Sequence, residues 1–526
     1  MALRWLVVGT LIFGCAVAGA EGHARADDVV VAYSPPDFMS AAPPLPAGED
    51  TAAVWRLDLA EALQIAVRQN LGLVLERESV HIANLGTVTA AGGFEPTLSA
   101  SYLHSSATEP PLTSVDGTVG QLFSAHEDDW QIGLGQKLES GTQLAVNVTN
   151  GRSLSTLGTA VEPLNYRAVV SVSVVQPLLR GFSLDRTIPR LGILRATIAS
   201  EKERYQLSVA ATDVVKQTED AYWDVVQALY RHDLELKSQG RAQEQLALTE
   251  RQIAAGMLPP SDLIGVQSTV AQHQLGVVES DEAVQKAWDV LRGALNLPRD
   301  QWTRPILPID PPQFVAGVVS NEDALATALK NRPDLAQMEL DLRTSILAVR
   351  QSENDKLPQL DLGVTASVLG EDAGYGEALQ QVAGADAHTW AVTMNMTWTP
   401  LHRATSAAAE IEQRHHRQAL VTREQLVQRI WLDVRDAVRN QRGAARLVIA
   451  AAAARKLAEQ TLEIEQRRFL NGTSSNINVA AKQEELARAQ VAELDAVLGH
   501  KKASSALLRA TGRLLPERHV ELDVRR

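Results

Sequence analysis

The sequence lacks most of what a compact enzyme or a disulfide-bonded domain uses. Its 526 residues contain one cysteine, Cys15, and only 4% aromatic residues. Such a lean composition suits long, closely packed helices better than a large globular core. No uncharged apolar run of about twenty residues follows the N-terminal segment, so we expect no transmembrane helix. If the mature protein lies in a membrane, it must therefore do so with strands.

Positive charge and catalytic patterns are also scarce. Fifty Lys and Arg residues face 63 Asp and Glu residues, a net charge of −13 that would repel a nucleic-acid backbone. We find no Gly-x-x-x-x-Gly-Lys-Ser/Thr loop and no catalytic triad or carboxylate pair in a supporting context. The adjacent His415 and His416 point to different sides of a helix, which favours a solvated surface over a metal site. We therefore expect no nucleic-acid partner, enzyme activity, cofactor or metal.

The first 26 residues have the features of an export signal. Arg4 precedes a short apolar core at residues 5–14, and small residues at Ala18 and Ala20, or at Ala24 and Ala26, suit cleavage. Removal of this segment would leave no cysteine for a disulfide. Alternatively, Cys15 is an acylated lipoprotein cysteine, although the bulky Phe13 fits such a signal poorly. Residues 27–56 are rich in proline and predict an extended leader.

The rest of the chain is built twice. Residues 61–70 align without a gap with residues 323–332, and Pro96 aligns with Pro358, at one offset of 262 positions. One offset shared over about forty residues indicates homologous repeats. We predict a first repeat at 57–296, a connector at 297–320, a second repeat at 321–514 and a C-terminal tail at 515–526.

Each repeat changes from helix to strand at its proline, which a helix cannot pass. In the strand regions, about 96–176 and about 358–399, apolar residues alternate with small or polar ones, as Leu360, Leu362 and Val364 do. Ten-residue segments of this kind are typical of outer-membrane barrel strands, but the pattern alone also fits a soluble sandwich. The export signal and the long flanking helices favour the barrel, and the spacing predicts six strands.

Two very long helices follow the strand regions, at about 184–255 and about 404–471. At 1.5 Å per residue each reaches roughly 100 Å. Each ends at a glycine, the usual helix C-cap, in tips at about 256–261 and about 472–476. Arg251 and Gly256 match Arg467 and Gly472 at an offset of 216 positions, and a shorter helix returns from each tip.

This doubled order of helix, strands, long helix, glycine tip and return helix resembles the TolC-like outer-membrane efflux channel family over residues 57–514. The resemblance implies a mainly α fold with β: two tandem repeats that form a long coiled-coil barrel and transmembrane β-barrel strands, completed by a homotrimer. It implies a passive conduit from periplasm to exterior in a tripartite efflux or type I secretion system. The channel would lie in the cell outer membrane, among its lipids, with its helices in the periplasm.

The resemblance also implies partners and site residues. A periplasmic adaptor protein linked to an inner-membrane pump would meet the tips, at Arg251, Gly256, Arg467 and Gly472. The family often places acids just beyond the second tip to line a gate. The candidates for a gate lining here are Asp262, Asn476 and Asn478.

Two departures and two alternatives remain open. The asparagines put an acidic gate in doubt, and six strands exceed the family's usual four. A periplasmic adaptor with one helical hairpin is the main alternative function, although its single hairpin does not explain the duplicated strand regions. An exported enzyme is the other, but it requires a convergent polar site.

Overall fold

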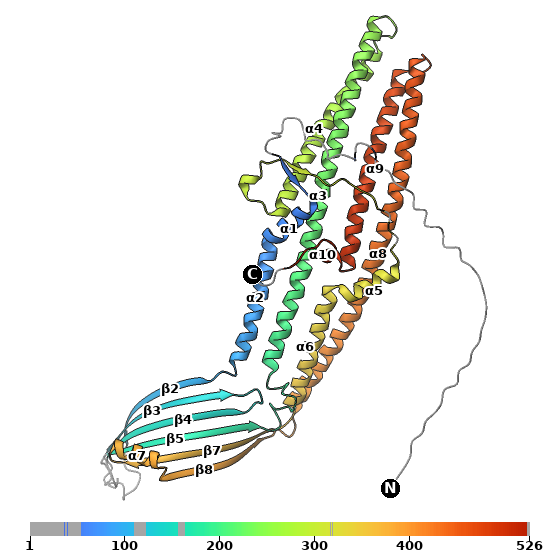
Figure 1. Cartoon of the computed structure of the whole chain (residues 1–526). Helices are drawn as coiled ribbons and strands as arrows, with labels where there is room; N and C mark the ends of the chain where they lie inside the picture. The colour runs from blue at the N-terminus through green and yellow to red at the C-terminus, as the bar shows by residue number, and fades with distance from the viewer. Residues whose placement is uncertain are drawn as a thin grey trace, which may run out of the picture.

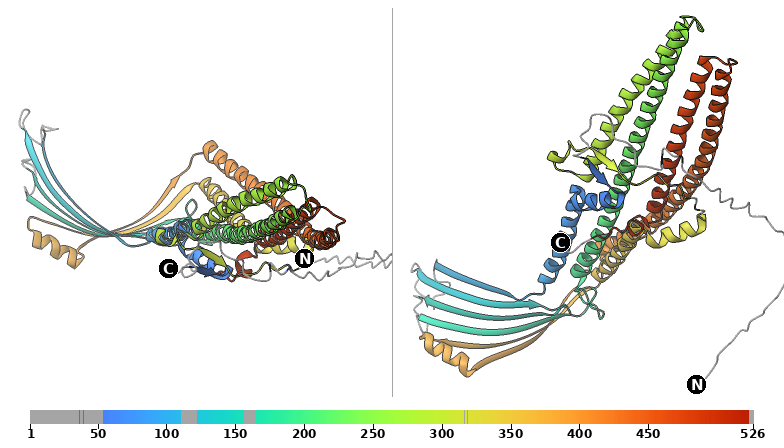
Figure 2. Two further views of the ribbon diagram at one scale, coloured as in Figure 1. Left: turned by 90° about the horizontal axis from the view of Figure 1, so that it is seen from above. Right: turned by 45° about the horizontal axis from the view of Figure 1, so that its top comes forward.

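The computed structural model describes residues 36, 39, 54–109, 122–155, 164–315, 317 and 319–522. The expected export signal with Cys15, and all of the expected leader except residues 36, 39 and 54–56, lie outside the described residues. The molecule is elongated (Figures 1 and 2), with a curved sheet at one end, parallel helical rods along its length and two hairpin tips at the other end.

One antiparallel sheet contains strands from both repeats, in the order β2-β3-β4-β5-β7-β8. Its strands are β2 (Thr97–Glu109), β3 (Phe123–Lys137), β4 (Gln143–Ser155), β5 (Leu164–Pro177), β7 (Gln359–Asp372) and β8 (Ala387–Thr397). Val172 in β5 lies opposite Val146 and Ala366, whereas the next residue, Ser173, lies opposite Ala145 and Thr365. One face is therefore apolar and the other is small or polar, as the alternation predicts. No second sheet covers the apolar face in the described chain, so the sandwich alternative is wrong.

A helix that the sequence analysis did not predict, α7 (Tyr375–Gly384), interrupts the second strand region. It covers the end of the sheet far from the rods (Figure 1). A Cβ at Gly370 would lie 1.9 Å from the Ala378 carbonyl oxygen, so only glycine allows β7 to approach α7 this closely. The Tyr166 and Tyr375 rings meet edge to face at 5.9 Å.

The rods are two long helices with shorter helices alongside them. The long ones are α3 (Leu191–Ala254) and α8 (Arg403–Leu470), with 64 and 68 residues. Helix α3 begins later than the expected 184 because the chain first turns, with Gly181 and Arg186 in left-handed conformations. The shorter rods are α2 (Leu71–Gly92) and α6 (Pro333–Asp355) near the sheet, and α4 (Asp262–Leu295) and α9 (Asn476–Ala510) near the tips.

The apolar helical pattern from about residue 57 to residue 92 predicts one helix, but this prediction is wrong, because the structure has two helices there. Helix α1 (Leu59–Gln69) ends at Asn70, whose extended backbone (ψ 120) breaks the helix, and whose side chain accepts a hydrogen bond from the Leu73 N–H. The second repeat breaks at the corresponding Arg332, between α5 (Asn321–Asn331) and α6. Proline follows Arg332 and disfavours a helical conformation there.

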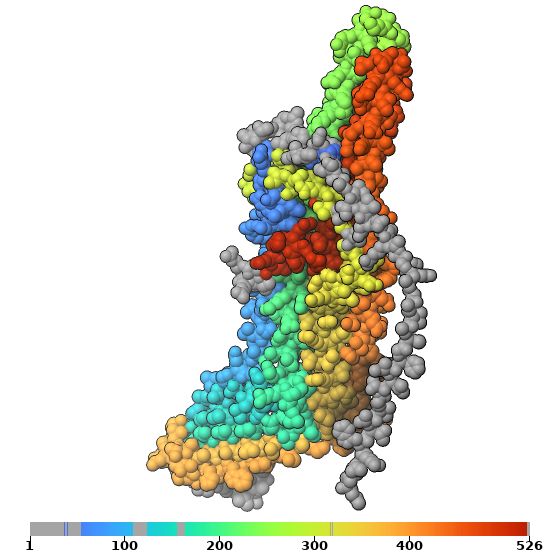
Figure 3. Space-filling model, turned by 45° about the vertical axis from the view of Figure 1, so that its right-hand side comes forward, coloured from blue at the N-terminus to red at the C-terminus, as the bar shows by residue number. Residues whose placement is uncertain are grey.

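A core at mid-length joins the two repeats. Strands β1 (Trp55–Leu57) and β6 (Ile306–Pro308) pair in parallel. A short 3₁₀ helix, Arg299–Gln301, precedes β6, and the last helix of the described chain is α10 (Leu514–Glu517). Leu514 and Leu515 pack into a cluster with Leu63 and Leu207 of the first repeat. Figure 3 shows the C-terminal part of the described chain, in dark red, lying across the rods.

His500 gives this core an expected pH dependence. It is buried on α9, 4.7 Å from the Phe314 ring, and burial lowers its pKa below 6.5. Well above pH 6.5 the imidazole is neutral in both states, but as the pH falls through 6.5 the unfolded chain binds a proton that the folded chain excludes. Stability therefore falls as the pH drops below 6.5. We expect the melting temperature of His500→Gln, measured by circular dichroism, to fall less between pH 7.5 and 5.5 than that of the wild type. An equal fall in both proteins would contradict this.

Candidate functional site

The two hairpin tips have the same backbone geometry. Gly256 has φ +72 and Gly472 has φ +71, the left-handed region that favours glycine. The Gly256 N–H donates to the Ile253 carbonyl and the Met257 N–H to the Gln252 carbonyl, both at 2.9 Å. These two bonds are the Schellman motif, and the second tip repeats them. No atom would lie within 4 Å of a Cβ at either glycine, so conformation and not packing requires glycine.

The tip arginines lie in the last turns of the long helices. Arg251 is exposed, and its Nε donates to the Ala247 carbonyl at 3.1 Å. Arg467 pairs with Glu463 and is 73% exposed. Cations there interact favourably with the negative end of a helix dipole. Both side chains also remain open to a partner.

The structure does not bring the three gate candidates together. Asp262 begins α4 at the first tip, whereas Asn476 and Asn478 begin α9 at the second. Asn478 is exposed, but Asn476 is only 6% exposed. Its Nδ2 donates to Thr249 Oγ1 at 2.5 Å, and its Oδ1 accepts from Gln245 Nε2. Asn476 thus fastens the second hairpin to α3.

This contact also sets the relative height of the tips. Thr249 lies seven positions, or about two helical turns, before Gly256. The first hairpin therefore projects beyond the second (Figure 1). Gln245 and Thr249 were not among the residues predicted from the sequence. Their one local signal is that two polar residues lie four positions apart on one helix face.

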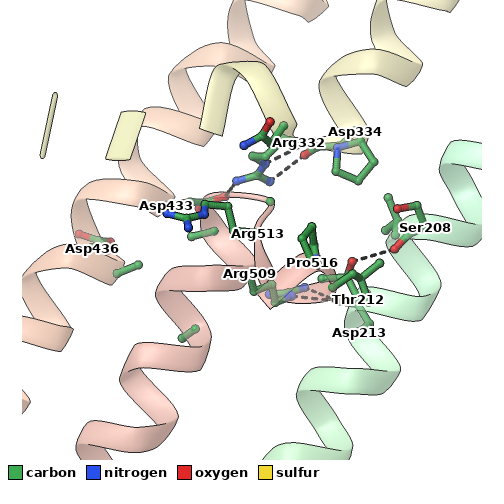
Figure 4. A pocket seen from close by; sticks show the side chains of 18 of the residues that line it. Ser208, Thr212, Asp213, Arg332, Asp334, Asp433, Asp436, Arg509, Arg513 and Pro516 are labelled. Carbon is green, nitrogen blue, oxygen red and sulfur yellow. Dashed lines mark hydrogen bonds and ion pairs between the residues drawn. The ribbon is translucent and has the colours of Figure 1, made fainter. Parts of the chain in front are cut away.

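A hollow of about 780 Å³ lies where α3, α8, α9, α10 and the α5–α6 junction converge (Figure 4). Arg332 lies between Asp334 and Asp433, at 2.7 and 3.3 Å. Burial lowers the pKa of Arg332, but these two carboxylates outweigh burial and raise it overall. Arg509 pairs with Asp213 at 2.7 Å. The other charged side chains that line the hollow are also ion-paired, so it is a structural junction between the repeats.

The structure locates the remaining sequence-based candidates. His415 bonds to Gln418 and His416 to Ser345, so the two imidazoles point apart. Within the described ranges, no cluster of three or more His, Cys, Asp or Glu side chains is placed so that it could hold a metal ion. Among the helices described, none combines the length and the apolar character that crossing a membrane requires.

Solved structures with the same fold are outer-membrane channels. The Campylobacter jejuni CmeC outer membrane channel is 15% identical to this chain, with a TM-score of 0.63. The match covers 87% of this chain and 86% of the CmeC chain. The outer-membrane channel OprN is 16% identical (TM-score 0.63), covering 91% and 98%. The open state of the Neisseria gonorrhoeae MtrE channel is 16% identical (TM-score 0.61), covering 88% and 91%. At these identities the likeness shows the fold alone.

One part of the chain matches a known family in sequence. Residues 324–513 match the family described as "Outer membrane efflux protein". No curated protein is significantly similar to the chain in sequence. The matched residues make up nearly all of the second repeat, and the first repeat has the same order of elements. In residues 324–513 the chain therefore matches the outer membrane efflux protein family in sequence, and over most of its length it has the fold of TolC-like outer-membrane efflux channels.

Proposed function

We propose that three copies of this chain form one channel, a passive conduit for solutes from the periplasm to the exterior. The energy comes from an inner-membrane pump, which a periplasmic adaptor protein connects to the tips. The assembly is a tripartite efflux system or a type I secretion system.

The open sheet is the observation that carries the proposal. Strands β2 and β8 each pair with one neighbour in the described chain, so each has a free edge. The apolar face is exposed: Trp390 is 73% and Met394 65% accessible. Unpaired backbone groups are not tolerated in lipid. Placing β2 of one copy beside β8 of the next removes both edges and closes a barrel.

Exposed apolar stripes on the outer rods support the same assembly. The side chains on α2 are Leu71, Leu75, Ile82 and Leu85, and those on the lower part of α8 are Ile411, Val421 and Leu432, all between 54% and 70% exposed. Helices α2 and α8 lie at opposite edges of the lower rods (Figure 1). Apolar stripes of this extent on a rod indicate an interface, and a second copy supplies both halves of it.

The trimer is tested by native mass spectrometry of the protein in mild detergent. We expect the mass of three chains. A monomer that persists at micromolar concentration would contradict the proposal, because it would show that the sheet is stable with its edges open.

We propose that the tips dock the adaptor through Arg251, Gly256, Arg467 and Gly472. Asp262 and Asn478, which reach solvent there, are our candidates for lining the inner mouth. Asn476 is held against α3 and instead fixes the second hairpin.

We expect Gly472→Val to abolish transport without preventing trimer formation. A β-branched residue at φ +71 is strained by roughly 1–3 kcal/mol, so the tip must change its backbone conformation. The matched control is Gly499→Val, within α9, where a Cβ meets nothing within 4 Å and φ is not positive. The measurement is efflux from a host that lacks its own channel, with native mass spectrometry of the purified variants. Unchanged efflux by Gly472→Val would remove the tip from the mechanism.

A further inference from the structure

Within one chain, α3 packs against α9 in a regular antiparallel register. Ser505 Oγ donates to Glu219 Oε2 at 2.8 Å, and the Lys501 ammonium lies 5.6 Å from the Trp223 ring. The contact is formed on α3 by Glu219, Trp223, Val226 and Tyr230, and on α9 by Leu494, Leu498, Lys501 and Ser505. All of these except Lys501 are buried.

The other two rods of the upper half correspond to this pair at a single offset. Helices α3 and α8 end at tips with left-handed Gly256 and Gly472. Helices α4 and α9 end before left-handed Asn296 and Gly512, with φ of +50 and +70. Both pairs are 216 positions apart, so the return helices match without insertion or deletion. Helix α8 therefore corresponds to α3, and α4 corresponds to α9, residue by residue.

The corresponding positions on α8 and α4 are open. They are Arg435, Arg439, Arg442 and Arg446 on α8, and Val278, Glu282, Gln285 and Asp289 on α4. Seven of the eight are exposed and Arg442 is half-buried. The contact positions on α3 and α9 cover one another inside the chain. The equivalent positions on α8 and α4 are uncovered, because these two helices do not meet within one chain. Helices α4 and α8 lie at opposite edges of the upper rods (Figure 1).

The two open faces are complementary in charge. We call Arg435, Arg439, Arg442 and Arg446 the arginine stripe, and Glu279, Glu282 and Asp289 the acidic stripe. Among the described residues, Arg439 is the one member of the arginine stripe with an ion-pair partner, Asp436. Glu282 and Asp289 have local partners, Lys286 at 2.8 Å and Arg292 at 2.9 Å, but remain 67% and 60% exposed.

We propose that the arginine stripe of one copy binds the acidic stripe of the next. The register that pairs Glu219 with Ser505 places Arg435 opposite Asp289, and the pairing of Val226 with Leu498 places Arg442 opposite Glu282. The inference rests on the ring of copies proposed above and names the surfaces that join it.

The geometry of this contact allows a ring to close. Each copy carries the arginine stripe at one edge and the acidic stripe at the other, so the contact is head-to-tail. Inside the chain, α3 of the first repeat and α9 of the second make the equivalent contact largely with apolar and aromatic residues. Charges at the subunit contact reject wrong pairings, because α8 set against α8, or α4 against α4, would oppose like charges.

Thiol cross-linking tests the register. Cys15, the one native cysteine, lies in the expected export signal, so introduced cysteines are the reactive thiols of the mature chain. Purified Arg442→Cys/Glu282→Cys protein treated with a short bismaleimide is expected to give covalent dimers and trimers. The control Arg442→Cys/Gln272→Cys, about 15 Å out of register along α4, is expected to stay monomeric on denaturing gels. Equal cross-linking of both pairs, or none of either, would overturn the proposed register.

Charge exchange tests the energetics. We expect Arg442→Glu or Glu282→Arg alone to lower the trimer-to-monomer ratio in dilute detergent at least about tenfold, and the double exchange to restore most of it. Single variants that assemble like a trimeric wild type would overturn the stripe pairing and leave the trimer standing. A monomeric wild type would instead overturn the proposed function.

Discussion

Replacing Arg518 with alanine is expected to destabilise the protein by about 3–5 kcal/mol, because it leaves a carboxylate buried without its partner. Glu219 on α3 has no exposed surface. Arg518 contacts both of its oxygens, with Nη2 to Oε1 at 2.5 Å and Nε to Oε2 at 3.2 Å. Ser505 also donates a hydrogen bond to the carboxylate, at 2.8 Å, but a neutral hydroxyl does not compensate the negative charge of Glu219.

Chemical denaturation followed by circular dichroism measures this loss. The matched control is Arg513→Ala, five residues earlier, which removes a surface pair with Glu517 worth about 0–1 kcal/mol. Glu219→Gln/Arg518→Met removes both charges and is expected to recover much of the stability. If Arg518→Ala costs no more than Arg513→Ala, the buried pair does not hold the C-terminal segment in place.

Val172→Arg is expected to lower the stability of the membrane-inserted protein by about 2–4 kcal/mol, the cost of a cation on the lipid face near the bilayer midplane. Val172 lies near the middle of β5, between Val146 and Ala366 on the apolar face. The matched control is Ser173→Arg, one position along on the polar face, between Ala145 and Thr365. An arginine there faces the wet interior of the barrel and costs little.

The measurement is the yield of folded, heat-modifiable protein in outer-membrane fractions, with denaturant titration in lipid vesicles for the energy difference. A larger loss for Ser173→Arg than for Val172→Arg would reverse the assignment of the two faces. Equal losses would show that neither face contacts lipid.

Locally encoded features of the fold were predictable from the sequence. Alternation as in Leu360, Leu362 and Val364 has a period of two, and it identified the strands and their apolar face because a strand displays that period directly. Gly256 and Gly472 identified both tips, since a left-handed C-cap favours glycine. The repeat at one offset extended each assignment to the other half of the chain.

Features set by longer-range packing were not predictable. The break at Asn70 leaves the apolar helical pattern intact on both sides, so the two helices read as one. Helix α7 exists where Gly370 admits its backbone against β7, a contact that the sequence does not display. The candidate site shows the same limit. Asn476 and Asn478 are two positions apart, yet only Asn476 is buried, because Thr249 and Gln245 meet it from another helix.

The C-terminal segment has a consequence for how the protein is made. The core around α3 is completed by Leu514, Leu515 and Arg518. The ion-pair partner of Glu219, Arg518, lies 299 positions further along the chain. The first repeat therefore cannot reach its final packing while the ribosome is still synthesising the second. A chain of this kind stays incompletely folded until its last residues emerge, and an incompletely folded chain is the form that translocation through a narrow channel requires.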